Sequence, residues 1–151
     1  MSESLSFSSQ PDPAPGPWPP PNQGLTRRTA IVSGHRMSYV TGGHGEPIIL
    51  LHGIGTASAT WRYTLPVLMQ HFTVYAPDML GCGESDKPDI DYAVPAMAGY
   101  IQEFMDAVGL DHAHFIGHSL GGGITLQLYA LCPERMDRVV LSASGGMGRA
   151  V

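Results

Sequence analysis

The sequence has little cysteine and little positive charge. Its two cysteines, Cys82 and Cys132, are too far apart to form a Cys-x-x-Cys redox or metal motif, so we expect two buried, reduced thiols. The chain has eight Lys and Arg residues against 13 Asp and Glu residues. Because the basic residues are scattered singly, no basic stripe is available for a nucleic acid or an anionic membrane surface.

Long apolar runs are also missing. A membrane-spanning helix takes roughly 18 consecutive apolar residues, and no such run occurs in the sequence. Residues 1–24 lack the basic start and the apolar core of a signal peptide. We therefore expect a cytoplasmic protein with no membrane or nucleic-acid partner. The sequence does not predict the oligomeric state.

Proline, by contrast, is abundant near the start of the chain. Residues 8–21 hold seven of the 13 prolines and few apolar side chains, so residues 1–24 are predicted to be a disordered, Pro-rich tail. A ligand for a proline-binding adaptor domain is the functional alternative, although flanking basic anchors are absent. Residues 25–151 are assigned to one domain. Because a complete α/β enzyme domain commonly needs about 200 to 250 residues, this domain is predicted to be incomplete.

Strand-like and helix-like segments alternate after the Pro-rich start. Strands are predicted at residues 29–32, 37–40, 48–51, 72–76, 113–116 and 138–141, and helices within residues 58–70, 97–108 and 120–131. The first two strands are predicted to form an edge hairpin that turns at residues 33–36. Strands joined through helices require right-handed crossovers. The predicted fold class is therefore α/β, a mostly parallel sheet with helices on both faces.

The strongest chemical signal is Gly117-His118-Ser119-Leu120-Gly121, a G-x-S-x-G motif between a predicted strand and a predicted helix. A serine hydroxyl is a poor nucleophile unless it is exposed and aimed, and a tight strand-to-helix turn presents it above the sheet. Small residues at 117 and 121 allow the strand and the helix to close on the turn. The start of the helix leaves N–H groups unpaired, so the backbone N–H of Leu120 can face an oxyanion.

A second motif, Leu51-His52-Gly53-Ile54-Gly55, follows the apolar strand predicted at residues 48–51. This loop is expected at the carboxyl end of the sheet, where ligand sites gather in α/β proteins. If the loop borders the turn at Ser119, the N–H of Ile54 is the second oxyanion donor. An ordinary glycine turn is the structural alternative.

The order and spacing of three segments resemble the α/β-hydrolase superfamily: residues 52–55, residues 78–88 and residues 117–122. Within it, the sequence is most similar to single-domain esterases and to the meta-cleavage-product carbon-carbon hydrolases, which share the 78–88 loop pattern and a segment such as Ser144-Gly145-Gly146. The resemblance covers roughly residues 29–151.

This resemblance implies that Ser119 is a nucleophile and that Ile54 and Leu120 supply the oxyanion N–H groups. It implies that Asp78 and Ser85 brace the loop near the site. The expected function is a serine hydrolase for a small-molecule ester or related carbonyl substrate, with a carbon-carbon bond hydrolase as the alternative. The resemblance implies no metal or organic cofactor. Serine at the nucleophile position argues against the epoxide-hydrolase and haloalkane-dehalogenase branches of the superfamily, because those branches use a carboxylate as the nucleophile.

The same resemblance implies that the chain is truncated before the cap and the last strands. The family places its catalytic acid and histidine beyond that point, and the alternative acid position after the strand at 138–141 holds Ser142, Ala143 and Ser144. We therefore expect the chain to be catalytically dead or nearly so, since losing the base costs on the order of 10⁶ in turnover. We also expect it to associate through an exposed apolar edge.

Other function classes remain open at this point. Gly53-x-Gly55-x-x-Ser58 followed by Asp78 imitates a dinucleotide-binding fingerprint, although its third glycine is replaced by serine. A noncatalytic binding module with the same fold is a further alternative. The pair His112-x-His114 invites a zinc interpretation, but too few further ligands follow it.

Overall fold

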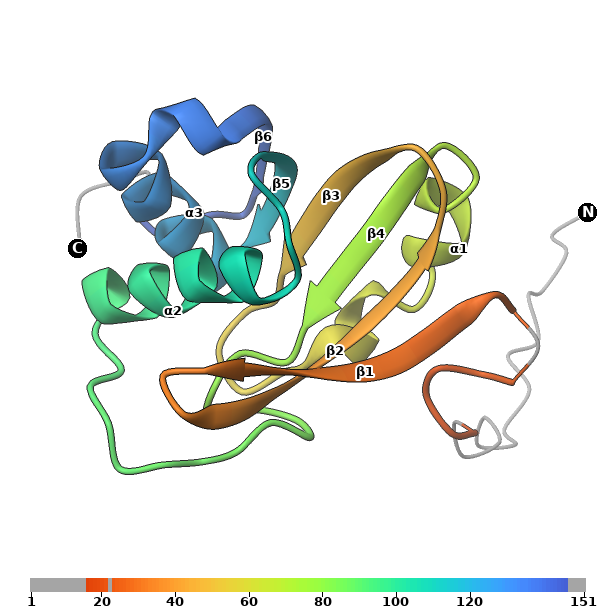
Figure 1. Cartoon of the computed structure of the whole chain (residues 1–151), viewed down its shortest axis with the longest axis horizontal. Helices are drawn as coiled ribbons and strands as arrows, with labels where there is room; N and C mark the ends of the chain where they lie inside the picture. Colours follow the sequence, from red (N-terminus) through yellow and green to blue (C-terminus); the bar gives the residue numbers. More distant parts are fainter. Residues whose placement is uncertain (1–15, 22, 147–151) are drawn as a thin grey trace, which may run out of the picture.

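The computed structural model describes residues 16–21 and 23–146. Six strands form one sheet in the order β1-β2-β4-β3-β5-β6 (Figure 1). Their bounds are Leu25–Val32 for β1, His35–Gly43 for β2, Glu46–Leu51 for β3, Phe72–Pro77 for β4, Ala113–His118 for β5 and Met136–Ser142 for β6. Strands β4, β3, β5 and β6 pair in parallel, whereas β2 is antiparallel to β1 and β4. The predicted mostly parallel sheet is confirmed.

The edge hairpin has a tighter turn than the sequence predicted. Ile31 pairs with Arg36 and Val32 pairs with His35, so only Ser33-Gly34 lies between the strands. Ser33 and Gly34 have φ angles of 48° and 79°, as in the two-residue type I′ turn, whose twist matches that of the flanking strands. The predicted turn at residues 33–36 is therefore two residues too long on the β2 side, because His35 and Arg36 belong to β2.

Helices cover both faces of the sheet, as predicted. Helices α2 (Val94–Ala107) and α3 (Leu120–Leu131) pack together on one face, and the 3₁₀ helix η1 (Ser58–Trp61) and helix α1 (Leu65–Leu68) lie on the other (Figure 1). A further 3₁₀ turn, η2 (Pro133–Arg135), precedes β6. The bounds of α3 match the predicted helix at residues 120–131.

The single helix predicted within residues 58–70 is wrong, because the structure has two short helices there. Pro66 lies in the first turn of α1. Proline has no N–H to donate to the carbonyl four residues earlier, and its ring clashes with that carbonyl in a helix interior. Apolar spacing alone therefore overestimated the length of this helix.

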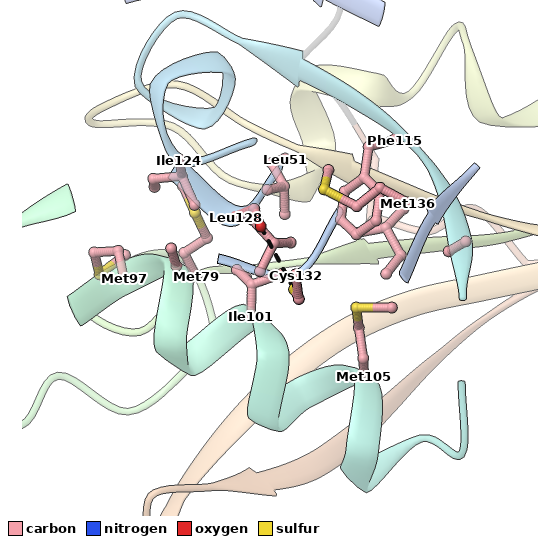
Figure 2. Close-up of a cluster of buried hydrophobic side chains, with 13 residues drawn as sticks. Leu51, Met79, Met97, Ile101, Met105, Phe115, Ile124, Leu128, Cys132 and Met136 are labelled. Atoms are coloured by element: carbon pink, nitrogen blue, oxygen red, sulfur yellow. Dashed lines mark hydrogen bonds between the residues drawn. The ribbon is translucent and has the colours of Figure 1, made fainter. Parts of the chain in front are cut away.

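Strand β3 is buried on both faces, which explains its run of apolar residues. Ile49 and Leu51 pack into the cluster beneath α2 and α3, whereas Ile48 and Leu50 face Trp61 on the opposite side. Figure 2 shows Leu51 surrounded by side chains from both long helices. Full burial of such a side chain contributes about 1.5–3 kcal/mol, so these contacts stabilise β3 between the helices of the two faces, and the loop at His52 follows directly after it.

The two thiols have different surroundings. Cys132 is buried in the cluster of Figure 2, whereas Cys82 is only half-buried, and neither forms a disulfide. The expectation of two buried thiols is thus correct for Cys132 and wrong for Cys82, which lies in the loop after β4. Burial raises the pKa of both thiols.

Part of the predicted Pro-rich tail contacts the sheet domain. The Trp18 side chain packs against the cluster around Trp61 and Leu65, and its indole N–H donates to Ser58 Oγ over 3.3 Å. Residues 1–15 of the predicted tail lie outside the described residues. In the described part of the chain, no helix combines the length and the apolar character needed to cross a membrane.

Candidate active site

Ser119 lies in the turn between β5 and α3, where it forms the N-cap of the helix. Its φ and ψ angles are 53° and −117°, a combination that costs energy for any residue with a Cβ. Strained residues of this kind persist only where the surrounding structure holds them. The strand-turn-helix setting expected for the motif at residues 117–121 is therefore present.

The backbone of Ser119 is held by the end of β6, by the loop that follows it and by the first turn of α3. Its N–H donates to the Ser142 carbonyl over 3.1 Å, and its carbonyl accepts from the N–H of Gly145 over 2.9 Å. Within the first turn of α3, Gly122 also donates to this carbonyl over 3.0 Å. The last residue of β6 and the loop after it thus stabilise the strained turn from outside the helix, a role that the sequence did not predict.

Glycine is required on the helical side of the turn. A Cβ at Gly121 would lie 2.6 Å from the His52 carbonyl oxygen and would also collide with the Leu51 carbonyl. This close approach brings the start of α3 against the end of β3. The expected role of a small residue at 121 follows directly from this contact.

The loop after β3 lies against the turn at Ser119. Strands β3 and β5 are parallel neighbours with Leu51 paired to Gly117, so their following loops emerge side by side. A Cβ added to Gly53 would lie 3.2 Å from the Cβ of Ser119. The backbone at Ile54, the next residue, is therefore close to the serine side chain.

Two backbone N–H groups are available near Ser119. The N–H of Ile54 has no hydrogen-bond partner among the described residues, and the residue is 77% exposed. Leu120 is the first residue of α3, and the first four N–H groups of a helix have no partner within it. The structure thus brings Ser119, Ile54 and Leu120 to one edge of the sheet.

His52 braces the loop and does not face the serine as a base. It is fully buried. Its Nε2 accepts from the N–H of Met79 over 3.0 Å, and its Nδ1 lies 2.8 Å from the Gly53 carbonyl oxygen. Burial lowers the pKa of His52, which favours the neutral ring.

Asp78 connects the loop after β4 to the rest of the site. Its carboxylate accepts from the N–H groups of Ser58 over 2.7 Å and Glu84 over 2.9 Å, and it pairs with Arg27 over 3.0 Å. Burial raises the pKa of Asp78, but these hydrogen bonds and the Arg27 charge outweigh burial and lower it overall. With 1% of its surface exposed, this carboxylate is not accessible to the ribose of a dinucleotide, which argues against that alternative.

Ser85 ties the same loop to β2. Its hydroxyl donates to the Asp78 carbonyl and accepts from the N–H of Ser38 over 2.8 Å. The contacts of Asp78 and Ser85 agree with the bracing roles that the resemblance implied.

Three of the other histidines contact groups other than Ser119. His112 pairs with Asp137 over 2.6 Å and His114 with Glu46 over 2.8 Å. No cluster of three or more metal-ligating side chains occurs in residues 16–21 and 23–146. The ring of His118 packs edge-on against Trp61. Over the same ranges, no hydrogen bond joins a histidine to the Ser119 hydroxyl.

The chain is similar in sequence to proteins of one fold family. A family described as the alpha/beta hydrolase fold matches residues 46–150. An uncharacterized protein of Mycobacterium tuberculosis H37Rv is 41% identical over 126 residues, which cover 83% of this chain and 37% of that protein. The soluble epoxide hydrolase of Corynebacterium sp. C12 is 40% identical over 100 residues, which cover 66% and 35% of the two chains.

A solved structure shares the fold as well as the sequence pattern. The meta-cleavage product hydrolase of Pseudomonas fluorescens IP01 matches with a TM-score of 0.78 and 35% identity, over 82% of this chain and 47% of that one. The chain thus spans less than half the length of each of these proteins.

Proposed function

Because the chain belongs to the alpha/beta hydrolase fold family, we propose that Ser119 is the nucleophile of a serine hydrolase. The substrate is an ester or a related small carbonyl compound, and the N–H groups of Ile54 and Leu120 bind the oxyanion. The observation that carries the proposal is the strained turn at Ser119, which lies against the loop at Gly53. A cytoplasmic location remains a prediction of the sequence.

In this mechanism the Ser119 hydroxyl attacks the carbonyl carbon and loses its proton to a base. The two N–H groups then stabilise the negative charge on the carbonyl oxygen. When this intermediate collapses, the ester C–O bond breaks and the alcohol leaves with the proton that the base took from Ser119. Water then gives a proton to the base and attacks the acyl-serine, which releases the acid and returns the proton to the Ser119 oxygen. Since no described histidine is hydrogen-bonded to the hydroxyl, we place the base and its acid partner outside the described residues. Removing a single oxyanion donor typically costs on the order of 10² to 10³ in rate, so both N–H groups matter.

Carbon-carbon bond hydrolysis is a second candidate, supported by the 35% identity to a meta-cleavage product hydrolase. It would use the same serine and the same N–H groups. The similarity to an epoxide hydrolase favours that activity less, because residue 119 is serine and not the carboxylate expected of that branch.

The proposal is tested by labelling the chain with a fluorophosphonate, with and without imidazole as an added base. We expect a covalent adduct on Ser119 by mass spectrometry, faster labelling as imidazole increases, and no adduct in Ser119→Ala. A chain that stays unlabelled in all conditions, or that is labelled on another residue, contradicts the proposed nucleophile.

A further inference from the structure

The peptide group between Gly53 and Ile54 has two side-chain partners on its carbonyl oxygen. The Gly53 oxygen lies 2.8 Å from His52 Nδ1 and accepts from the Thr56 hydroxyl, also over 2.8 Å. The N–H of the same peptide belongs to Ile54. In a trans peptide the N–H points opposite to the C=O, so whatever holds the carbonyl also aims the N–H.

The tautomer of His52 follows from its two partners. Its Nε2 accepts from the N–H of Met79 over 3.0 Å and so carries a lone pair. In the neutral ring the proton is then on Nδ1, which donates to the Gly53 carbonyl. His52 is thus a fixed donor on one side of this oxygen.

Thr56 supplies the second donor. Thr56 is exposed as a residue. Its hydroxyl nevertheless lies within hydrogen-bond distance of both the Gly53 oxygen and the His52 ring. Two donors on one carbonyl restrict rotation of the peptide plane better than one, and they polarise the peptide so that its N–H becomes a stronger donor. Because Gly53 lies against the Cβ of Ser119, a small rotation of this peptide changes the direction of the N–H relative to the serine.

We propose that Thr56 is a positioning residue for the hydrolase reaction, because its hydroxyl, together with His52, aims the N–H of Ile54 at the oxyanion. This inference rests on the proposed function of Ser119. It assigns to Thr56 no contact with the substrate, since the hydroxyl acts through the Gly53 carbonyl.

Three variants test this role through the rate of fluorophosphonate labelling in imidazole. Thr56→Val keeps the shape and removes the donor, so labelling of Ser119 should slow by about fivefold to tenfold, the effect of one hydrogen bond. Thr56→Ser keeps the hydroxyl and should label within about twofold of the parent chain. Thr60→Val makes the same change at an exposed threonine whose hydroxyl has no partner among the described residues, and it should label at the parent rate.

A second measurement separates positioning from general destabilisation. In a ¹⁵N-labelled protein, phosphonylation of Ser119 should move the Ile54 amide proton downfield, and this shift should be smaller in Thr56→Val than in Thr56→Ser. If the valine variant does not fold, Thr56→Ala serves in its place, because residue 56 is exposed.

The outcomes distinguish the inference from the proposed function. If the parent chain is not labelled at Ser119, the proposed nucleophile is wrong and the inference is lost with it. If the parent is labelled but Thr56→Val has the same rate and the same Ile54 shift, only the role of Thr56 is overturned. Equal slowing in Thr60→Val would likewise overturn it.

Discussion

At the scale of single residues, the proposed nucleophile Ser119 has a strained backbone that is supported by residues far from it in the sequence. Its positive φ angle is balanced by hydrogen bonds to Ser142 and from Gly145. The sequence predicted the turn because G-x-S-x-G between a strand and a helix is a strong local pattern. It did not predict the two supporting partners, because hydrogen bonds between distant backbone groups leave no mark in residue spacing.

Replacing Gly121 by alanine should destabilise the fold, because the new Cβ would collide with the Leu51 and His52 carbonyls. We expect a loss of about 1–3 kcal/mol in the free energy of unfolding, typical of overpacking. Gly99→Ala is the matched control in helix α2, where a Cβ meets nothing within 4 Å and should stabilise by about 0.5–1 kcal/mol. Urea unfolding of both variants measures the difference, and equal stabilities would argue against the close approach at Gly121.

Asp78 should make the fold sensitive to acid. Its pKa is lowered in the folded state, so its stabilisation is present above the ordinary carboxyl pKa of about 3.9 and is lost as the pH falls. At neutral pH, Asp78→Asn should be less stable by about 3 kcal/mol, because Arg27 loses its buried partner.

The difference between the parent chain and Asp78→Asn should therefore shrink toward about pH 3. Urea unfolding at neutral and acidic pH measures both values. A difference that stays constant with pH would show that ionisation of Asp78 does not contribute.

At the scale of helices and strands, prediction succeeded where one local signal dominated. Helix α3 has the predicted bounds because Ser119 forms its N-cap and Pro133 follows its end. The helix predicted within residues 58–70 failed at Pro66, where backbone chemistry overrode apolar spacing. The Ser33-Gly34 turn was predicted too wide, because short polar segments give little information on where pairing stops.

Strand β6 should promote association of the chain. It is the last strand in the sheet order among the described residues, with Val140 54% exposed. Exposed edges with apolar side chains pair readily with other chains, and lysine on an edge opposes this. We expect Val140→Lys to shift the chain toward the monomer in sedimentation velocity.

Val67→Lys is the matched control, because Val67 is 61% exposed but lies on helix α1. It should leave the association unchanged. If the parent chain is already monomeric, or if both lysine variants act alike, β6 is not the surface of association.

At the scale of the whole molecule, the order of the elements places the site. Parallel strands β3 and β5 end at the same edge, so the loop at Gly53 and the turn at Ser119 meet although about sixty-five residues separate them. The sequence predicted this meeting from the fold class and the two motifs. The substrate could not be predicted in this way, because it depends on the shape of a pocket and not on the order of strands.

The most direct test of the account is a crystal structure of the chain phosphonylated at Ser119. Oxyanion donors lie about 2.7–3.1 Å from the oxygen that they stabilise. We predict that the phosphoryl oxygen lies at such distances from the backbone nitrogens of both Ile54 and Leu120. A phosphoryl oxygen turned toward solvent, away from both nitrogens, would contradict the proposed oxyanion site.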